Sequence, residues 1–259
     1  MSAARDAITP VVLTYNEEPN LDRTLACLRW ARRVVVLDSG STDRTEEIAR
    51  SFSNVSWNTR RFDSHGAQWR HALFETSIST EYGLALDADM QLSPELFREI
   101  EHQFLPGGFD GGIVPFEYRI GQYMLMSSLY PPQLRLFRLA QVISSTIGHT
   151  HRFDLEGKLF RFRNYIIHDD RKPVDRWAQS QISYSRLERV RIQSATHLNV
   201  KDRLRKRGLM PLIAGSLGYL RAGGPLRGTA ALQYAYERFT YEALLAIRLL
   251  DDRNRISDR

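Results

Sequence analysis

The first ninety residues alternate between short strand-like runs and segments whose apolar residues recur at helical spacing. The strand-like runs are Ile8 to Tyr15, Val34 to Leu37, Val55 to Phe62 and Leu84 to Leu86. Between the first two, Leu21, Leu25 and Leu28 mark one face of a helix. This alternation predicts an α/β fold, in which a mostly parallel sheet is joined by right-handed helical crossovers.

Polar residues follow three of the predicted strands. Thr14 to Glu17 follow the first, Asp38 follows the second, and Asp87-Ala88-Asp89 follow the fourth. Ligands of open α/β sheets bind at this end of the strands, so these side chains are candidates for one binding site. Two carboxylates there suit a divalent cation held across a diphosphate, and Asp38 suits a ribose or base contact. Turn formation is the alternative for Asp38, and for Asp43 we expect turn formation together with helix capping, with Glu46 three residues later.

Two common nucleotide-binding patterns are absent from the sequence. No Gly-x-Gly-x-x-Gly follows the first predicted strand, and no Gly-x-x-x-x-Gly-Lys-Ser/Thr occurs anywhere. A dinucleotide-dependent dehydrogenase and a P-loop nucleotidase are therefore not expected. The single Cys27 excludes a disulfide framework and a zinc site built from several cysteines.

The chain of 259 residues is long enough for one large α/β domain with an appendage. Its first residues, Met1 to Asp6, lack the apolar core of a signal peptide, and no apolar run approaches the roughly 20 residues of a spanning helix. We therefore expect a cytoplasmic protein. The predicted division is a catalytic domain over residues 1–170 and a helical, basic region over residues 171–259.

Positive charge is concentrated in the second half. Residues 171–207 contain eleven Lys/Arg and three Asp/Glu, a net charge of +8 in a chain whose total is +6. An apolar run, Leu209 to Leu220, follows the basic cluster Lys201 to Arg207. A basic cluster beside a short apolar segment is typical of a membrane interface, and a solvated basic face is the alternative.

Several segments together resemble glycosyltransferase family 2, the inverting enzymes of the GT-A fold. They are Val11 to Glu18, Val35 to Asp43, Gly66-Ala67-Gln68 with Arg70, and Leu86 to Asp89. Within that family, Tyr130 to Arg138 and Ile166-Ile167-His168 are similar to segments of small bacterial β-1,4-glucosyltransferase-type enzymes of lipopolysaccharide core biosynthesis. The resemblance covers about residues 8 to 170.

The resemblance implies a role for each matched position. Asp87 and Asp89 correspond to the family's Asp-x-Asp pair, which binds Mg²⁺ or Mn²⁺ beside the donor, and His168 would complete that site or end a buried strand. The remaining nucleotide-binding positions would be Thr14, Tyr15, Asn16, Glu17, Asp38, Gly66, Gln68 and Arg70.

The sequence departs from its relatives at the expected general base. Thr150 stands where the related core enzymes have a glutamate, and a threonine hydroxyl does not act as a general base at ordinary pH. Candidate replacements are Asp154, which is the first choice, His151 and Asp169. A zinc site at His149 and His151 is not expected, because no third ligand is suitably spaced.

The sequence therefore predicts a metal-dependent inverting glycosyltransferase that uses a nucleotide-sugar donor, with UDP the expected nucleotide. The expected acceptor is a lipid-anchored glycan or a cell-envelope polysaccharide. The expected location is the inner face of the cytoplasmic membrane, bound peripherally through the basic C-terminal region, and no nucleic-acid partner is expected. The alternatives are a sugar-nucleotide pyrophosphorylase-like nucleotidyltransferase and a non-enzymatic module that binds membranes or polyanions.

Overall fold

The computed structural model describes residues 3–147 and 150–257. It divides into two compact units. The first unit extends to Glu117 and resumes over Tyr130–Thr146 and Thr150–Arg171. The second contains Tyr118–Leu129 and the C-terminal region from Lys172 onward. Each unit is described by itself below.

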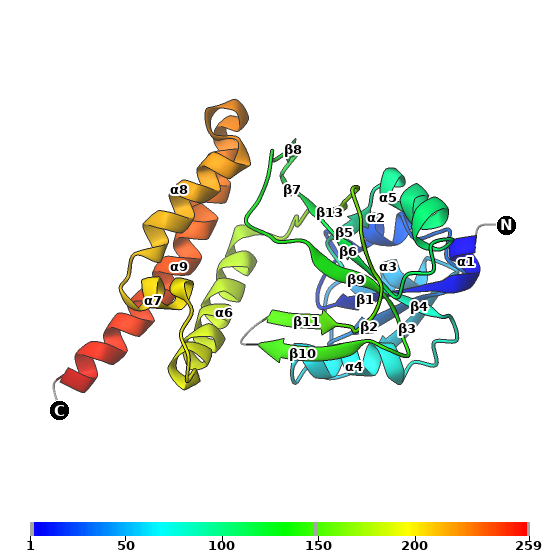
Figure 1. Cartoon of the computed structure of the whole chain (residues 1–259), viewed down its shortest axis with the longest axis horizontal. Coiled ribbons are helices and arrows are strands. Elements are labelled where there is room, and N and C mark those ends of the chain that lie inside the picture. Colours follow the sequence, from blue (N-terminus) through cyan, green and yellow to red (C-terminus); the bar gives the residue numbers. More distant parts are fainter. Residues whose placement is uncertain (1–2, 148–149, 258–259) are drawn as a thin grey trace. The chain divides into compact units, whose positions relative to one another are not determined.

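The first unit is built on a mixed, mostly parallel sheet with the order β12-β6-β9-β4-β1-β2-β3 (Figure 1). Its strands are β1 (Ile8–Thr14), β2 (Val34–Asp38), β3 (Val55–Thr59), β4 (Tyr82–Asp87), β6 (Gly111–Val114), β9 (Gln133–Arg138) and β12 (Leu159–Arg161). Strands β4, β1, β2 and β3 are parallel neighbours, whereas β9 is antiparallel to both β4 and β6. The expected α/β architecture is confirmed.

Helices connect these strands. They are α1 (Ala3–Ala7), α2 (Leu21–Ala26), α3 (Thr45–Arg50), α4 (His65–Phe74), α5 (Pro94–Glu99) and the π-helical turn η1 (Ile100–Phe104). The start of α5 is well defined, because Ser93 Oγ accepts a hydrogen bond from the Leu96 amide at 3.1 Å and Pro94 occupies the first turn. The capping expected for Asp43 is wrong, since Arg44 is the N-cap of α3. Asp43 instead forms a turn, with its Oδ1 accepting from the Thr45 amide at 3.0 Å.

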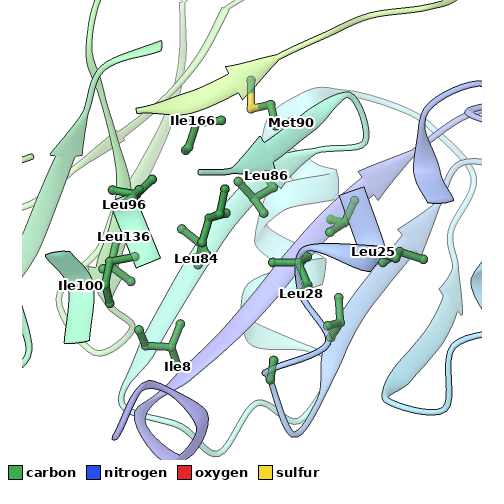
Figure 2. Packing of buried hydrophobic residues seen from close by; sticks show 14 of the residues in the cluster. Ile8, Leu25, Leu28, Leu84, Leu86, Met90, Leu96, Ile100, Leu136 and Ile166 are labelled. Carbon is green, nitrogen blue, oxygen red and sulfur yellow. The ribbon is translucent and has the colours of Figure 1, made fainter. Parts of the chain in front are cut away.

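The hydrophobic core lies on both faces of the sheet, because successive side chains of a strand point to opposite faces. On one face, Val12 and Leu86 pack with Leu25 of α2 and with residues of α5 and η1 (Figure 2). On the other face, Val11 and Ala85 pack with residues of α4. Strand β4 is consequently buried on both faces, which fixes the position of the acidic residues at its end.

Short strands complete the first unit. Strand β5 (Met90–Leu92) pairs antiparallel with β13 (Ile166–His168), and His168 lies opposite Met90. Strands β10 (Ile143–Ile147) and β11 (Thr150–Asp154) pair with each other. Pro115 separates β6 from β7 (Phe116–Ile120), because proline lacks the amide hydrogen that a ladder requires.

The second unit is mainly helical. Its helices are α6 (Val174–Ser194), α7 (Val200–Lys206), α8 (Met210–Ala222), the 3₁₀ turn η2 (Gly224–Arg227) and α9 (Gly228–Ser257). The hairpin arm of this unit, Tyr118–Leu129, contains β8 (Tyr123–Met124) and packs Leu125 against Ala222 and Tyr234. The Leu129 amide donates to the Tyr234 hydroxyl at 2.7 Å, which ties the arm to α9.

Part of the basic cluster Lys201 to Arg207 is buried. Arg205 is 5% exposed and donates to both carboxylate oxygens of Glu242, at 2.9 and 2.7 Å, and to Glu188 at 2.6 Å. Arg191 contacts Glu188 and Asp202 in the same cluster. Some of the positive charge counted in the sequence is therefore neutralised inside the unit. Within residues 3–147 and 150–257, no helix combines the length and the apolar character needed to cross a bilayer.

Candidate functional site

Asp38 organises the loop that follows β2. Thr14 and Asp38 are register partners on β1 and β2, and the Thr14 hydroxyl donates to Asp38 Oδ1 at 3.0 Å. The amides of Gly40 and Ser41 donate to Oδ2 at 2.8 and 2.7 Å, and the Ser41 hydroxyl also donates to Oδ1. Both carboxylate oxygens thus hold the loop in shape, which is the turn-forming role given above as the alternative for Asp38.

The loop after β1 is tied to the loop after β2. Asn16 has a positive φ of 53°, a conformation that asparagine adopts more readily than most residues. Its amide donates to Ser41 Oγ at 2.6 Å, and its Oδ1 accepts from the Thr42 amide at 2.6 Å. The next amide, that of Glu17, donates to Thr45 Oγ1 at 2.7 Å. Asn16 and Glu17, two of the predicted site residues, are therefore hydrogen-bonded to the loop after β2, and the two loops together form a floor at the strand ends. The neighbouring Tyr15 is exposed.

The segment from Gly66 to Arg70 lies in the first turns of α4. Gln68 is 1% exposed and donates to Ser39 Oγ at 3.0 Å and to the Arg60 carbonyl at 2.9 Å. It therefore braces the chain just after β2 and just after β3. Arg70 is exposed and Gly66 is half-buried.

Asp87 and Asp89 have different surroundings. The Asp87 side chain is 43% exposed, and its Oδ2 lies 3.4 Å from Nη2 of Arg135. The Asp89 side chain is only 12% exposed, and its Oδ2 lies 3.8 Å from Nε2 of His168. The Asp169 amide donates to the Asp89 carbonyl at 3.0 Å, which holds the end of β13 beside the acidic turn. The structure therefore brings together the predicted acid pair and His168.

Arg135 and Tyr130 also belong to this cluster. The Arg135 side chain is 7% exposed, its guanidinium lies 5.6 Å from the Phe116 ring centroid, and among the described residues its Nε–H has no hydrogen-bond partner. The Tyr130 ring lies 5.7 Å from the His168 ring. Burial raises the pKa of Tyr130, and the charge of Arg135 opposes that shift while Asp87 and Asp89 add to it. Both residues belong to the segment Tyr130 to Arg138, whose sequence alone indicates a role for neither.

The donor set suits a divalent cation that takes ligands from its substrate. Asp89 and His168 offer a carboxylate oxygen and an imidazole nitrogen side by side, with Asp87 two residues from Asp89. No group of three or more His, Cys, Asp or Glu side chains arranged to hold a metal occurs in the part of the chain that the structure describes. Because Mg²⁺ is commonly held by one or two carboxylates plus phosphate oxygens and water, the residues present fit such an ion.

The three candidates for the general base lie in different environments. Asp154 is exposed at the end of β11, and its Oδ1 accepts from the Leu155 amide at 2.9 Å. Asp169 is 2% exposed and is paired with Arg23 and with Arg171, the latter at 3.0 Å. Two guanidinium partners favour a structural role for Asp169. The side chain of His151 lies outside the described residues.

Solved structures share the fold of this chain. The chain superposes on Staphylococcus aureus TarS residues 1–349 in complex with UDP-GlcNAc with a TM-score of 0.50, 13% identity and coverage of 95% of this chain and 92% of that one. It superposes on glucosyl-3-phosphoglycerate synthase from Mycobacterium tuberculosis, in complex with Mn²⁺, UDP and phosphoglyceric acid, with a TM-score of 0.50, 14% identity and coverage of 76% and 81%. At these identities the likeness shows the fold alone, and the expected GT-A-like fold is confirmed.

Sequence comparison identifies the family. The lipopolysaccharide core biosynthesis glycosyltransferase LpsC of Rhizobium meliloti (strain 1021) is 26% identical over 156 residues, which are 59% of this chain. The match spans 55% of that relative's length. The family model described as glycosyl transferase family 2 matches residues 9–156, which is more than half of the chain and includes the loops after β1 and β2 and the acidic turn after β4. This chain belongs to glycosyltransferase family 2.

Proposed function

We propose that the protein transfers a sugar from a UDP-linked donor to a lipid-anchored glycan or another cell-envelope polysaccharide, with inversion at the anomeric carbon. Family membership supports sugar transfer, and the UDP and UDP-GlcNAc complexes of structures with the same fold support the choice of nucleotide. The printed function of the Rhizobium relative, lipopolysaccharide core biosynthesis, supports the acceptor class. The observation that carries the proposal is the clustering of Asp87, Asp89, His168 and Arg135 at the end of β4.

The nucleotide would occupy the floor formed by the loops after β1 and β2. Asn16 and Asp38 hold these loops through hydrogen bonds, so the loops are held in place before the donor arrives. Preorganisation of this kind reduces the ordering cost of binding. The diphosphate would then extend toward the acidic turn, since Asp87 is in register with Leu13 of β1.

Asp89 and His168 would hold a divalent cation together with the donor's phosphate oxygens, and Asp87 would contact the ribose or the same ion. A bound cation of this kind stabilises negative charge on the leaving diphosphate. The family commonly uses such an ion, and the synthase from Mycobacterium tuberculosis was solved with Mn²⁺.

Arg135 would add a fixed positive charge on the leaving-group side. Its guanidinium is buried and held between Asp87 and the Phe116 ring, so it needs little reorganisation to meet an anion. Charges placed in advance where charge develops are a large contribution to catalysis in sites that exclude water.

An inverting displacement also needs a base that removes the proton of the acceptor hydroxyl. Asp154 is our candidate, because it is an exposed carboxylate in the segment where related enzymes carry their glutamate, whereas Asp169 is paired with two arginines.

A thermal-shift panel tests donor and metal use together. UDP-, GDP-, CMP- and dTDP-sugars are each added with and without Mn²⁺, and the UDP-sugar with Mn²⁺ should give the largest rise in Tm because a ligand that binds only the folded state stabilises it. Asp89→Asn should lose the Mn²⁺-dependent part of the rise. Asp175→Asn, an exposed carboxylate at the start of α6, should keep it. No response to any nucleotide sugar, or a full response in Asp89→Asn, would contradict the proposal.

A further inference from the structure

Helix α8 carries an exposed apolar stripe. Its members are large aliphatic side chains between 40% and 69% exposed: Leu209, Leu212, Ile213, Leu217 and Leu220. Leu226, in the turn that follows, is 80% exposed. Single exposed leucines are ordinary on protein surfaces, but four large aliphatic residues along one helix and one at its N-cap form an apolar patch of the kind that marks an interaction surface.

The stripe lies opposite the side of α8 that packs on α9. A Cβ atom on Gly215 would lie 3.3 Å from Cβ of Phe239, and one on Gly218 would lie 3.4 Å from Cγ of Arg238. These small residues bring the two helices close together, and at 100° per residue the exposed leucines fall on the far side of the helix. The apolar stripe is therefore separate from the surface of α8 that contacts α9.

From Arg203 to Arg227, every charged residue of the sequence is basic. Helix α8 contains no Asp or Glu, and Arg207 and Arg221, both exposed, lie before and at the end of the helix. Arg203 and Lys206, which precede α8 in the sequence, are exposed. Arg205 is buried and forms ion pairs with Glu188 and Glu242. Cations at both ends of an aliphatic stripe complement a surface that is apolar below and anionic above.

We propose that α8 lies in the plane of an anionic lipid bilayer, with Leu212, Ile213, Leu217 and Leu220 among the acyl chains and Arg207 and Arg221 at the level of the phosphates. The 13 residues of α8 extend about 20 Å, which is too short to span the hydrocarbon but suits a helix lying on it. The inference deepens the proposed function and rests on it, because a lipid-anchored acceptor is confined to the same surface.

Vesicle binding by the full-length chain tests this inference. The probes are vesicles of phosphatidylcholine with and without about 30% phosphatidylglycerol, a proportion of charged lipid that attracts basic surfaces strongly. The wild type should sediment with the anionic vesicles and more weakly with the neutral ones. The double variant Leu212→Glu/Leu220→Glu should bind anionic vesicles at least about tenfold more weakly, since two carboxylates would have to enter the apolar layer.

The matched control is Val174→Glu/Val200→Glu. It introduces the same two charges at apolar residues that are each 70% exposed, at the first positions of α6 and α7. The control should bind vesicles nearly as well as the wild type. Both double variants should unfold at the wild-type temperature, because all four side chains are exposed.

Three results would overturn the inference. They are an absence of wild-type binding to anionic vesicles, equal losses in the two double variants, or a wild-type dimer that the Leu212→Glu/Leu220→Glu variant dissociates without any vesicle binding, as seen by analytical ultracentrifugation. The UDP-sugar response should persist in that variant, which separates failure of this inference from failure of the proposed function. If the wild type binds vesicles but no nucleotide sugar, the result would contradict the proposed sugar transfer and still support the binding of α8 to lipid.

Discussion

Arg135 provides the sharpest test at the scale of single residues. Arg135→Met preserves much of the side-chain volume against Phe116 but removes the positive charge beside Asp87. We expect the rate of sugar transfer to fall by about 10²- to 10³-fold, the usual effect of removing one preorganised charge contact. Arg135→Lys should recover only part of the rate, because lysine lacks the planar guanidinium.

The measurement is steady-state kinetics together with the unfolding temperature. Arg98→Met, which removes an exposed guanidinium of α5, is the control and should change neither quantity by much. Wild-type kinetics in Arg135→Met would show that the buried charge serves only to pair with Asp87.

Two carboxylates distinguish a catalytic from a structural role. Asp154→Asn should abolish most sugar transfer and leave the UDP-sugar thermal shift and the stability unchanged, because its side chain is exposed. Asp169→Asn should destabilise the fold by about 1 to 2 kcal/mol, because it weakens the charge-assisted hydrogen bonds from Arg23 and Arg171 to a buried carboxylate. Urea unfolding and transfer assays on the same samples separate the two effects. Loss of sugar transfer without loss of stability in Asp169→Asn, with normal transfer in Asp154→Asn, would identify Asp169 as the base.

Sequence reasoning identified the acid pair and His168 because these residues stand at strand ends and match a family motif. It assigned no role to Arg135, whose contact with Asp87 joins β9 to β4 across 48 residues and depends on antiparallel pairing. It also left the role of Asp38 open. The Gly40 and Ser41 hydrogen bonds are local to the turn after β2, but the Thr14 hydroxyl reaches Asp38 only when β1 and β2 are in register. Contacts of this kind are set by the fold and not by spacing.

At the scale of elements, the ion cluster between α6, α7 and α9 should dominate the stability of the second unit. Arg205→Met leaves the carboxylates of Glu188 and Glu242, both at least 90% buried, without their main cation. Breaking a buried pair from one side costs about 3 to 5 kcal/mol. Lys206→Met, at the exposed neighbouring position, should stay within about 0.5 kcal/mol of the wild type. Chemical denaturation followed by circular dichroism measures both, and equal effects would show that the cluster adds little.

The four strands predicted in the first ninety residues are all present because each combines apolar residues with flanking turns or helices. The boundaries differ where pairing decides them. Strand β3 ends at Thr59 and not at Phe62, since its printed pairing with β2 ends where Asp38 meets Thr59. The pairs β5–β13 and β10–β11 were not predicted. Strands β5 and β13 have three residues each, too few for a periodic pattern, and β10 and β11 are rich in polar residues.

At the scale of the whole molecule, the count of charges along the chain overstated the basic surface of its second half. The sequence shows an excess of arginine and lysine over residues 171–207, but Arg205 pairs with Glu242, 37 residues away and outside that range. Arg189 likewise pairs with Asp252, 63 residues away. For this reason the proposed lipid contact is the apolar stripe of α8 with Arg207 and Arg221, and not the basic cluster itself.

The position of β4 in the middle of the sheet has a consequence for how the molecule opens. Its residues Tyr82 to Leu86 are buried and its neighbours are β1 and β9, whereas β3 lies at the edge with partly exposed residues. In deuterium exchange followed by mass spectrometry, the amides of Leu84 to Leu86 should be replaced only through complete unfolding of the unit, and those of β3 through smaller fluctuations.

Equal exchange rates in the two strands would contradict this expectation. If β4 exchanges more slowly than β3, the acidic turn follows the strand whose amides are the last in the unit to exchange. The distance between Asp89 and His168 would then be maintained during fluctuations that open the edge strand β3.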